Sequence, residues 1–339
     1  YEHTGTPMTM KKAVQFARLG NPADVVDLVD IEQPPLGPGD ARIDVEAAPI
    51  NPSHLMTLRG LYGVQPKLPA VPGAEGVGAV VEIGAAVTNV RVGDRVMLPP
   101  YSGAWQQQVT VPAARIAVIY PAGGDPVQLS MLMANPPTAH LLLTTYGDLG
   151  PGDWVIQNAA NSAVGQYLMR LAKIRGIKTV NVVRRAGLEA LVAQSGGDIC
   201  LVDGDDLAEQ VKDATGGAAI RVGIDCIAGR ATARIAACLA EGGTVVNYGR
   251  LSEEPCIIPA DETIFRNIAL RGIWLTRWLT RESTPEARKA VYDELARYVI
   301  DGTLAVHVEA TYPLARIREA VTHAGQGGRG GKIVILPNG

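Results

Sequence analysis

The fold is decided by the stretch WVIQNAANSAVG at residues 154–165, together with the helix and strand that follow it. The sequence predicts a buried strand at 154–157. The helical spacing of Val164, Leu168 and Leu171 predicts a helix at about 163–174. A further apolar run predicts a strand at 179–183. A strand, a turn, a helix and a second strand make up one unit of a dinucleotide-binding fold.

The turn of this unit departs from the usual glycine-rich fingerprint. That fingerprint has three glycines, which serve the tight turn, the approach to a pyrophosphate and the packing of helix on strand. Only the third is present, as Gly165, while Ala160 and Ser162 hold the other two places. Taken alone, the turn is also compatible with a plain strand–helix–strand unit that binds nothing.

Two further features favour a dinucleotide. The predicted helix begins with free backbone N–H groups, which attract an anion. The second strand ends at Arg184 and Arg185, where NADH-binding proteins usually carry an acidic residue for the ribose 2′-hydroxyl. Two guanidinium groups suit a 2′-phosphate instead. We therefore expect NADPH, with a solvated basic strand end as the alternative.

Working outward, strands and helices keep alternating, which is typical of a parallel sheet covered on both faces. Further strands are predicted at 199–202, 222–226, 244–248 and 268–274, with helices at 188–194, 207–214 and 231–240 between them. Residues before about 130 are expected to form short strands with Gly and Pro turns. A helix at 285–300, short strands and a final strand at 332–336 complete the chain. The predicted fold class is α/β, a β-rich domain plus a doubly wound parallel sheet.

Composition excludes several kinds of protein. The length of 339 residues suggests two domains, and 47% hydrophobic with 19% charged residues is ordinary for a globular protein. A net charge of −3 gives no sign of a nucleic-acid partner. We find no run of ~18 apolar residues that would cross a membrane. Residues 1–10 lack a signal-peptide pattern, so we do not expect secretion.

The cysteines and histidines give no case for a metal. The four cysteines form no C-x-x-C pair, which indicates buried thiols in a reducing compartment. A zinc alcohol dehydrogenase needs a Cys/His ligand set. Ala74, in the string Gly-Ala-Glu-Gly, stands where zinc relatives carry histidine. We therefore expect no metal.

Several motifs resemble the zinc-free medium-chain dehydrogenase/reductases, and more narrowly their mitochondrial trans-2-enoyl-CoA (2-enoyl thioester) reductase branch. The matching strings are PINPS at 49–53, GLYG at 60–63, LPAVPG at 68–73, NP at 135–136, QNAANS at 157–162, NVVR at 181–184 and WLTRW at 274–278. The resemblance runs from about residue 12 to 336. It implies a GroES-like domain at 1–133 and 276–339, a Rossmann NADPH-binding domain at 134–275, an active site in the cleft between them, and a homodimer.

The resemblance also implies roles for individual residues. Tyr62 falls on the family's catalytic tyrosine. Cofactor contacts are implied for Asn135, Asn161, Ser162, Ala163, Val164, Arg184, Arg185, Tyr248, Gly249, Arg250, Leu251, Ile273, Trp274, Leu275 and Lys332. Asn51 and Trp278 are implied to line the substrate pocket. Core packing explains Trp278 equally well, and without the resemblance Tyr62 would be read as packing at a barrel rim.

The chain also departs from the family pattern. His54 stands where the family usually has Asp, and Ala74 where it usually has Asn. Pro137 and His140 replace Cys and Tyr, and Arg250 replaces Gly. The first two departures put the substrate preference in doubt. We expect both histidines to be structural and Arg250 to face solvent, with a phosphate contact as its alternative.

The expected reaction is the NADPH-dependent reduction of a trans-2-enoyl thioester, carried by CoA or acyl carrier protein. Hydride reaches the β-carbon, and Tyr62 gives a proton to the α-carbon, because a tyrosine is ordinarily protonated at neutral pH. A quinone oxidoreductase of the same superfamily and a non-enzymatic NADPH-binding protein are the competing interpretations. The expected location is a bacterial cytoplasm or a mitochondrial matrix.

Overall fold

The computed structural model describes residues 10–121 and 123–339. It groups the chain into two compact units, residues 1–134 with 289–339 and residues 135–288. The chain therefore leaves the first unit, forms the second, and returns. The predicted domain boundaries, with a return at residue 276, stay a prediction.

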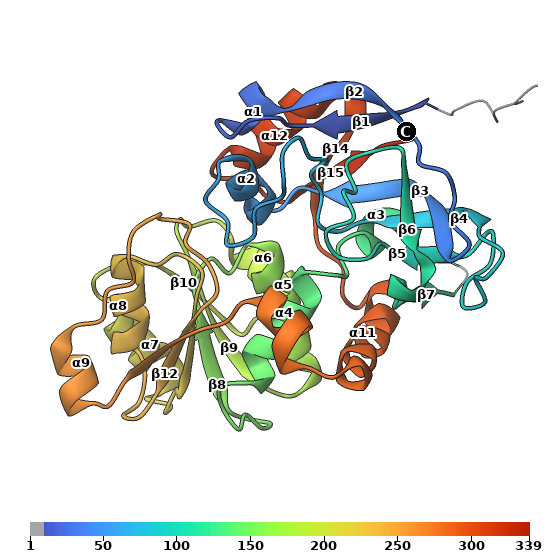
Figure 1. Ribbon diagram of the computed structural model, residues 1–339. Helices are drawn as coiled ribbons and strands as arrows, with labels where there is room; N and C mark the ends of the chain where they lie inside the picture. The colour runs from blue at the N-terminus through green and yellow to red at the C-terminus, as the bar shows by residue number, and fades with distance from the viewer. Residues whose placement is uncertain (1–9, 122) are drawn as a thin grey trace, which may run out of the picture. The chain divides into compact units, whose positions relative to one another are not determined.

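The second unit is a parallel sheet with strand order β10-β9-β8-β11-β12-β13 (Figure 1). Its strands are β8 (Trp154–Gln157), β9 (Lys178–Val183), β10 (Ile199–Val202), β11 (Val222–Asp225), β12 (Thr244–Asn247) and β13 (Ala269–Gly272). This is the strand order of a full dinucleotide-binding fold, and it reverses direction between β8 and β11. The predicted doubly wound sheet is confirmed, with strand ends shifted by at most two residues.

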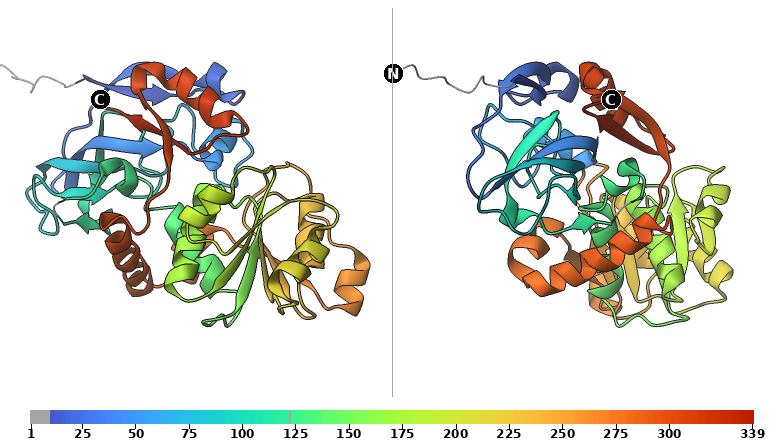
Figure 2. Two further views of the ribbon diagram at one scale, coloured as in Figure 1. Left: turned by 180° about the vertical axis from the view of Figure 1, so that it is seen from behind. Right: turned by 90° about the vertical axis from the view of Figure 1, so that its right-hand side faces the viewer.

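Helices cover both faces of this sheet (Figure 2). They are α4 (Asn135–Thr144), α5 (Ala163–Ile174), α6 (Glu189–Gln194), α7 (Leu207–Thr215), α8 (Arg230–Ala237), α9 (Ala260–Phe265) and the short α10 (Leu275–Arg277). One core joins Val182 of β9 to α7 and α8, and another joins the next residue, Val183, to α5 and α6. Side chains of a strand alternate between faces, so consecutive residues serve opposite helix layers.

The first unit is β-rich. Its larger sheet runs β14-β15-β3-β4-β5-β7, with β6 also paired to β3. These strands are β3 (Asp40–Pro49), β4 (Val77–Ile83), β5 (Arg95–Met97), β6 (Gln108–Pro112), β7 (Ile119–Tyr120), β14 (Val308–Pro313) and β15 (Lys332–Leu336). A separate hairpin pairs β1 (Met10–Gln15) with β2 (Asp27–Glu32). Because β15 pairs with β3, the end of the chain completes a sheet that its beginning starts.

Helices pack on this sheet and close its core. They are α1 (Pro22–Val25), α2 (Pro52–Leu58), α3 (Pro126–Leu129) and α12 (Ile317–Gly325). A further helix, α11 (Pro285–Ile300), contains the point in the chain, between residues 288 and 289, at which the second unit ends and the first resumes. The prediction of only short strands between 300 and 332 was wrong, because α12 lies there after β14. Its buried residues Ile317, Ala320, Val321 and Ala324 have the spacing of a helix face. Figure 2 shows α12 beside α1 and the β1–β2 hairpin.

Candidate functional site

The predicted cofactor residues of the second unit follow the carboxyl ends of parallel strands. Residues 161–164 follow β8, residues 184–185 follow β9, residues 248–251 follow β12 and residues 273–275 follow β13. Parallel strands end at the same sheet edge, and open sheets of this kind bind ligands at that edge, where the strand order reverses. The sequence spreads these segments over more than a hundred positions, but the sheet gives them one common edge.

A buried carboxylate organises this edge at the reversal point. Asp225, at the end of β11, is fully buried, and its Oδ1 accepts hydrogen bonds from the Asn158 amide at 2.7 Å and from the backbone N–H groups of Ile227 and Ala228. Its Oδ2 accepts from the Thr232 hydroxyl at 2.7 Å, on α8. The charge is thus surrounded by donors, as a buried carboxylate requires. Asp225 thereby fixes the start of α8 against the end of β8.

At the start of α5, the helix backbone packs closely against the turn that precedes it. The Ser162 hydroxyl accepts the Gly165 N–H at 3.1 Å, which caps the helix. A Cβ added to Gly165 would lie 2.4 Å from the carbonyl oxygen of Ala160. Only glycine fits there, because the helix packs directly on the turn. The one glycine that the turn retains therefore performs the helix–strand packing role of the fingerprint.

Two further features fit a nucleotide at this edge. A Cβ on Gly249 would lie 2.6 Å from both the carbonyl oxygen and the sulfur of Cys226, so the loop after β12 comes very close to β11. Burial raises the pKa of the neighbouring Tyr248 well above its ordinary value, with Cys226 raising it and Ser162 lowering it. Within residues 10–121 and 123–339, the Tyr248 hydroxyl is buried without a partner of good hydrogen-bond geometry. A polar ligand at the start of α5 could supply one.

Both basic residues after β9 are exposed. Arg184 and Arg185 directly follow Val183, the last residue of the strand. An exposed guanidinium is accessible to a phosphate from solvent, and its planar set of N–H donors matches the phosphate oxygens. The position therefore suits the 2′-phosphate contact that the sequence predicts.

In the first unit, a buried network joins predicted site residues to one that the prediction missed. The Lys332 ammonium donates hydrogen bonds to Asn51 Oδ1 and, at 3.3 Å, to the carbonyl oxygen of Ile50. The Asn51 amide nitrogen donates to Glu75 Oε1 at 2.5 Å. The other oxygen of Glu75 accepts the N–H of Ala134 at 3.0 Å. Asn51 thus bridges a buried acid and a buried base.

In this network, burial disfavours the charged forms of Glu75 and Lys332, whereas their opposite charges favour them. Burial raises the pKa of Glu75 to about 7, although the Lys332 charge, the Asn51 amide and the Ala134 N–H all lower it. Burial lowers the pKa of Lys332 to about 8, although Glu75 acts to raise it and Arg329 lowers it further. The attraction between the two groups favours the charged form of each, but burial outweighs it at Glu75 and at Lys332. The backbone that Glu75 holds, at Ala134, directly precedes the predicted cofactor contact Asn135.

The two family departures, His54 and Ala74, contact each other. The Ala74 N–H lies 3.0 Å from His54 Nε2, and the ring packs edge-on against Trp105 with centroids 5.5 Å apart. Burial lowers the pKa of His54 to about 3, with help from the Lys332 charge and against a hydrogen bond to the Pro49 carbonyl. A neutral ring held in this way is structural, as the sequence predicted.

The other predicted residues lie in less regular surroundings. Tyr62 is half-buried in the loop after α2, and its carbonyl accepts the Gln65 amide at 3.0 Å. Asn135 begins α4 and is half-buried. Trp278 is half-buried and begins a π-helical turn, Trp278–Glu282. The catalytic and pocket roles of these residues remain predictions.

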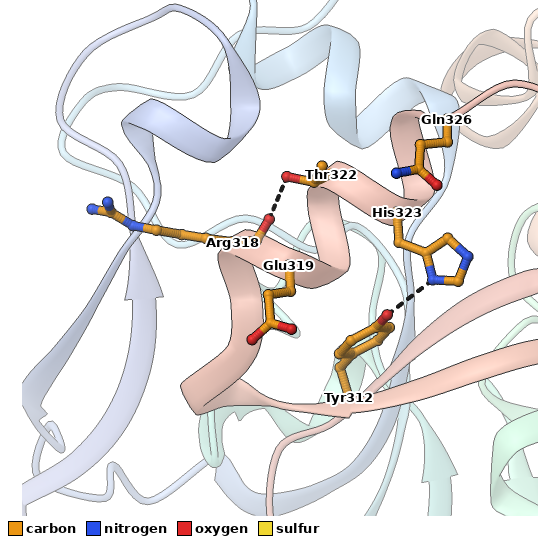
Figure 3. Close-up of a pocket in the computed structure, with 6 residues that line it drawn as sticks. All are labelled: Tyr312, Arg318, Glu319, Thr322, His323 and Gln326. Carbon is orange, nitrogen blue, oxygen red and sulfur yellow. Dashed lines mark hydrogen bonds between the residues drawn. The ribbon is translucent and has the colours of Figure 1, made fainter.

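A hollow of about 530 Å³ in the first unit is not a site for this chemistry. Figure 3 shows its lining, with the Tyr312 hydroxyl 2.9 Å from His323 Nδ1. None of the predicted site residues lines it. Arg318, at its rim, already pairs with Asp27 at 2.6 Å.

In the part of the chain that the structure describes, no three or more His, Cys, Asp or Glu side chains group as a metal site would require. Among the same residues, no helix combines the length and the apolar character needed to cross a membrane.

Comparison with known proteins places the chain. It is 39% identical over 269 residues to the mitochondrial enoyl-[acyl-carrier-protein] reductase of Caenorhabditis elegans, covering 76% of this chain and 75% of the relative. It is 35% identical over 333 residues to the protein of the same name from Arabidopsis thaliana, covering 96% and 88%. This chain belongs to the enoyl thioester reductase branch of the medium-chain dehydrogenase/reductases.

Other comparisons agree with this family of reductases. Residues 37–121 match the family model of the alcohol dehydrogenase GroES-like domain, and residues 163–293 match that of the zinc-binding dehydrogenases. A solved structure described as an NADPH:quinone reductase from Bacillus thuringiensis is similar, with a TM-score of 0.89 and 28% identity over 97% of this chain and 99% of that one. The predicted family and its GroES-like and Rossmann folds are confirmed.

Proposed function

We propose that the chain is an NADPH-dependent reductase of trans-2-enoyl thioesters. The likeness to the enoyl-[acyl-carrier-protein] reductases carries this proposal, because it extends over 96% of the chain for the Arabidopsis relative. The relatives' names give the substrate class as an enoyl group on acyl carrier protein. Whether this chain takes acyl carrier protein or CoA as the carrier is part of the test.

The second unit supports NADPH as the cofactor. The N-terminus of α5, with Gly165 packed on the turn, offers backbone N–H groups to a pyrophosphate. The buried Tyr248 hydroxyl lies at the same edge, next to Ser162. Arg184 and Arg185 follow β9, where a ribose 2′-phosphate would lie. These residues fit the phosphorylated cofactor better than NADH, because no acidic side chain follows β9 directly.

The proposed chemistry divides between cofactor and protein. When bound, NADPH would supply the hydride for the β-carbon of the enoyl thioester. Tyr62 donates its hydroxyl proton to the α-carbon, so that a saturated acyl thioester results. Asn51, held by Lys332 and Glu75, lines the pocket at a fixed orientation. Trp278 is proposed to line the pocket for the acyl chain.

The domain assignment, assembly and location are part of the same proposal. We assign residues 1–133 and 276–339 to the GroES-like domain and residues 134–275 to the Rossmann domain, and we infer a homodimer. The curated relatives named above are mitochondrial proteins. A mitochondrial matrix location is therefore the one that the relatives favour.

One competing function has an observation in its favour. The similar solved structure from Bacillus thuringiensis is described as a quinone reductase, and its TM-score is high. Such an enzyme has the same fold and cofactor but needs no proton-donating tyrosine.

A parallel assay separates these functions. NADPH absorbance is followed with crotonyl-CoA, a longer trans-2-enoyl-CoA, an enoyl-acyl carrier protein and a quinone, each at matched concentration. Consumption of NADPH with the enoyl thioesters alone is the expected result. Consumption with the quinone alone would establish the competing function, and NADPH binding without any turnover would show a non-enzymatic binding protein.

A further inference from the structure

Next to the predicted 2′-phosphate position, the structure holds an ion pair that the proposed reaction does not use. Asp203 follows β10 and Arg234 lies on α8. The guanidinium binds the carboxylate through two hydrogen bonds, Nε to Oδ1 at 2.6 Å and a terminal nitrogen to Oδ2 at 2.5 Å. Both side chains are mostly buried, with 16% of Asp203 and 25% of Arg234 exposed. Such a bidentate pair is stronger and better defined than an ordinary surface ion pair.

Asp203 lies directly beside the end of β9. In the parallel pairing of β10 with β9, Val202 is the partner of Val183. The Asp203 N–H then donates to the Val183 carbonyl at 2.9 Å. Arg184 is the next residue after Val183, so the acid and the predicted phosphate ligand occupy neighbouring positions on adjacent strands.

The contacts of Asp203 show which face of the sheet it reaches. Val182 and Leu201 pack in the core formed with α7 and α8. Two residues beyond Leu201, Asp203 turns toward that same face, whereas Arg184 lies in the bend that directly follows β9. For Asp203, the contact with Arg234 of α8 shows this directly.

An uncompensated carboxylate here would oppose NADPH in two ways. It would repel a 2′-phosphate, and it would attract the Arg184 guanidinium away from that phosphate. NADH has no 2′-phosphate and would not be repelled. We infer that Arg234 is a specificity-determining residue, which favours NADPH over NADH by neutralising Asp203. This inference rests on the proposed NADPH preference and deepens it.

The rest of the edge holds Arg234 in place for this role. Asp225 accepts the N–H groups of Ile227 and Ala228 and the Thr232 hydroxyl, which fixes the first turn of α8. Arg234 follows within the next turn of that helix. It reaches Asp203 from a helix that is itself anchored at the reversal point of the sheet.

The test measures cofactor affinity without any enoyl substrate. Dissociation constants of NADPH and NADH are measured by nicotinamide fluorescence for the full chain and its R234Q variant. We expect R234Q to weaken NADPH binding on the order of tenfold and NADH binding less than about twofold. This difference should shrink at about 0.5 M salt, because salt screens the repulsion between the 2′-phosphate and the carboxylate that the loss of Arg234 uncovers. Equal weakening of both cofactors, or no salt dependence, would overturn the inference.

Three further variants sharpen the test. The double variant D203N/R234Q should restore the wild-type preference, because no carboxylate is left to neutralise. D203N alone should bind NADPH at least as tightly as the wild type, and weaker binding would contradict the inference even if R234Q fails to fold. The matched control is R221Q, which removes an Asp–Arg pair with Asp153 (3.3 Å) at the amino ends of the strands and should change neither constant.

The same measurement separates a failure of the proposed NADPH preference from a failure of the role inferred for Arg234. A wild-type chain with equal affinity for both cofactors would overturn the proposed cofactor and the inference together. A wild type that prefers NADPH, with an unchanged preference in R234Q, would overturn the inference alone.

Discussion

At the scale of single residues, the candidate site contains groups that the sequence reveals unequally well. Tyr62 stands out through its motif, GLYG, although its loop position after α2 has no regular structure. Glu75 gives no such signal, because an acid in the string Gly-Ala-Glu-Gly looks like an ordinary surface residue. Its burial is visible only once β15 brings Lys332 beside Asn51. The one available hint was that zinc relatives carry a Gly-His-Glu motif at this position.

Substituting Tyr62 by Phe tests the proton donor. The change removes one hydroxyl from a half-buried loop residue, so we expect the fold and NADPH binding to be retained. Turnover of crotonyl-CoA should fall at least ~tenfold, in keeping with the usual contribution of a general acid. The matched control is Y101F, which alters an exposed tyrosine of the same unit. Unchanged turnover in Y62F, or an equal loss in Y101F, would remove Tyr62 from the mechanism.

Glu75 makes stability depend on pH in a specific direction. Its pKa is raised from its ordinary value of 4.5 to about 7, chiefly by burial. The folded state therefore holds the proton more tightly than the unfolded state. Its contribution is fully present below about pH 4.5 and is lost as pH rises to about 7. Lys332, with a pKa lowered to about 8, acts in the alkaline range instead.

The E75Q variant isolates this contribution, because glutamine does not titrate. Urea unfolding of both proteins is compared at pH 5, 6 and 7. The free energy of unfolding of the wild type should fall relative to that of E75Q over this range, by up to a few kcal/mol. The difference between the two proteins is what matters, because other carboxyl groups titrate in both. A constant difference across the range would show that Glu75 does not change its charge there.

At the scale of secondary-structure elements, prediction succeeded where one pattern dominated. The helix over 163–174 and the strand over 332–336 have their predicted bounds, and the six parallel strands deviate by two residues at most. Buried parallel strands give continuous apolar runs, which are easy to recognise. α12 was missed although its apolar spacing is helical, because Gly and Pro turns dominate the surrounding segment. β1 and β2 fall in the region predicted to form short strands, although the sequence analysis gave neither of them its own bounds.

Gly165 tests the fit of α5 against its turn. Alanine there would place its Cβ 2.4 Å from a backbone oxygen of Ala160, a contact that only a backbone shift can relieve. We expect G165A to lower stability by about 1–3 kcal/mol, as overpacking usually does. We also expect it to reduce the rise in melting temperature that NADPH causes. The control is G150A, whose nearest atom is 4.0 Å away. Wild-type behaviour of G165A would contradict the proposed packing role.

At the scale of the whole molecule, segments from the beginning and the end of the chain form one unit. The first unit is completed by residues 289–339, and β15 pairs with β3 across nearly the full length of the sequence. Local patterns cannot show such pairing, because it depends on contacts distant in sequence. The resemblance to the reductase family implied only that the end of the chain belongs to the same domain as its beginning.

The most direct test of the central claim follows the hydride. The full chain is incubated with crotonyl-CoA and NADPH that carries deuterium at the transferred position of the nicotinamide, and the product is analysed by mass spectrometry and NMR. We expect butyryl-CoA with one deuterium at the β-carbon and a solvent-derived proton at the α-carbon. Butyryl-CoA without deuterium at the β-carbon, or no butyryl-CoA while a quinone is reduced, would contradict it.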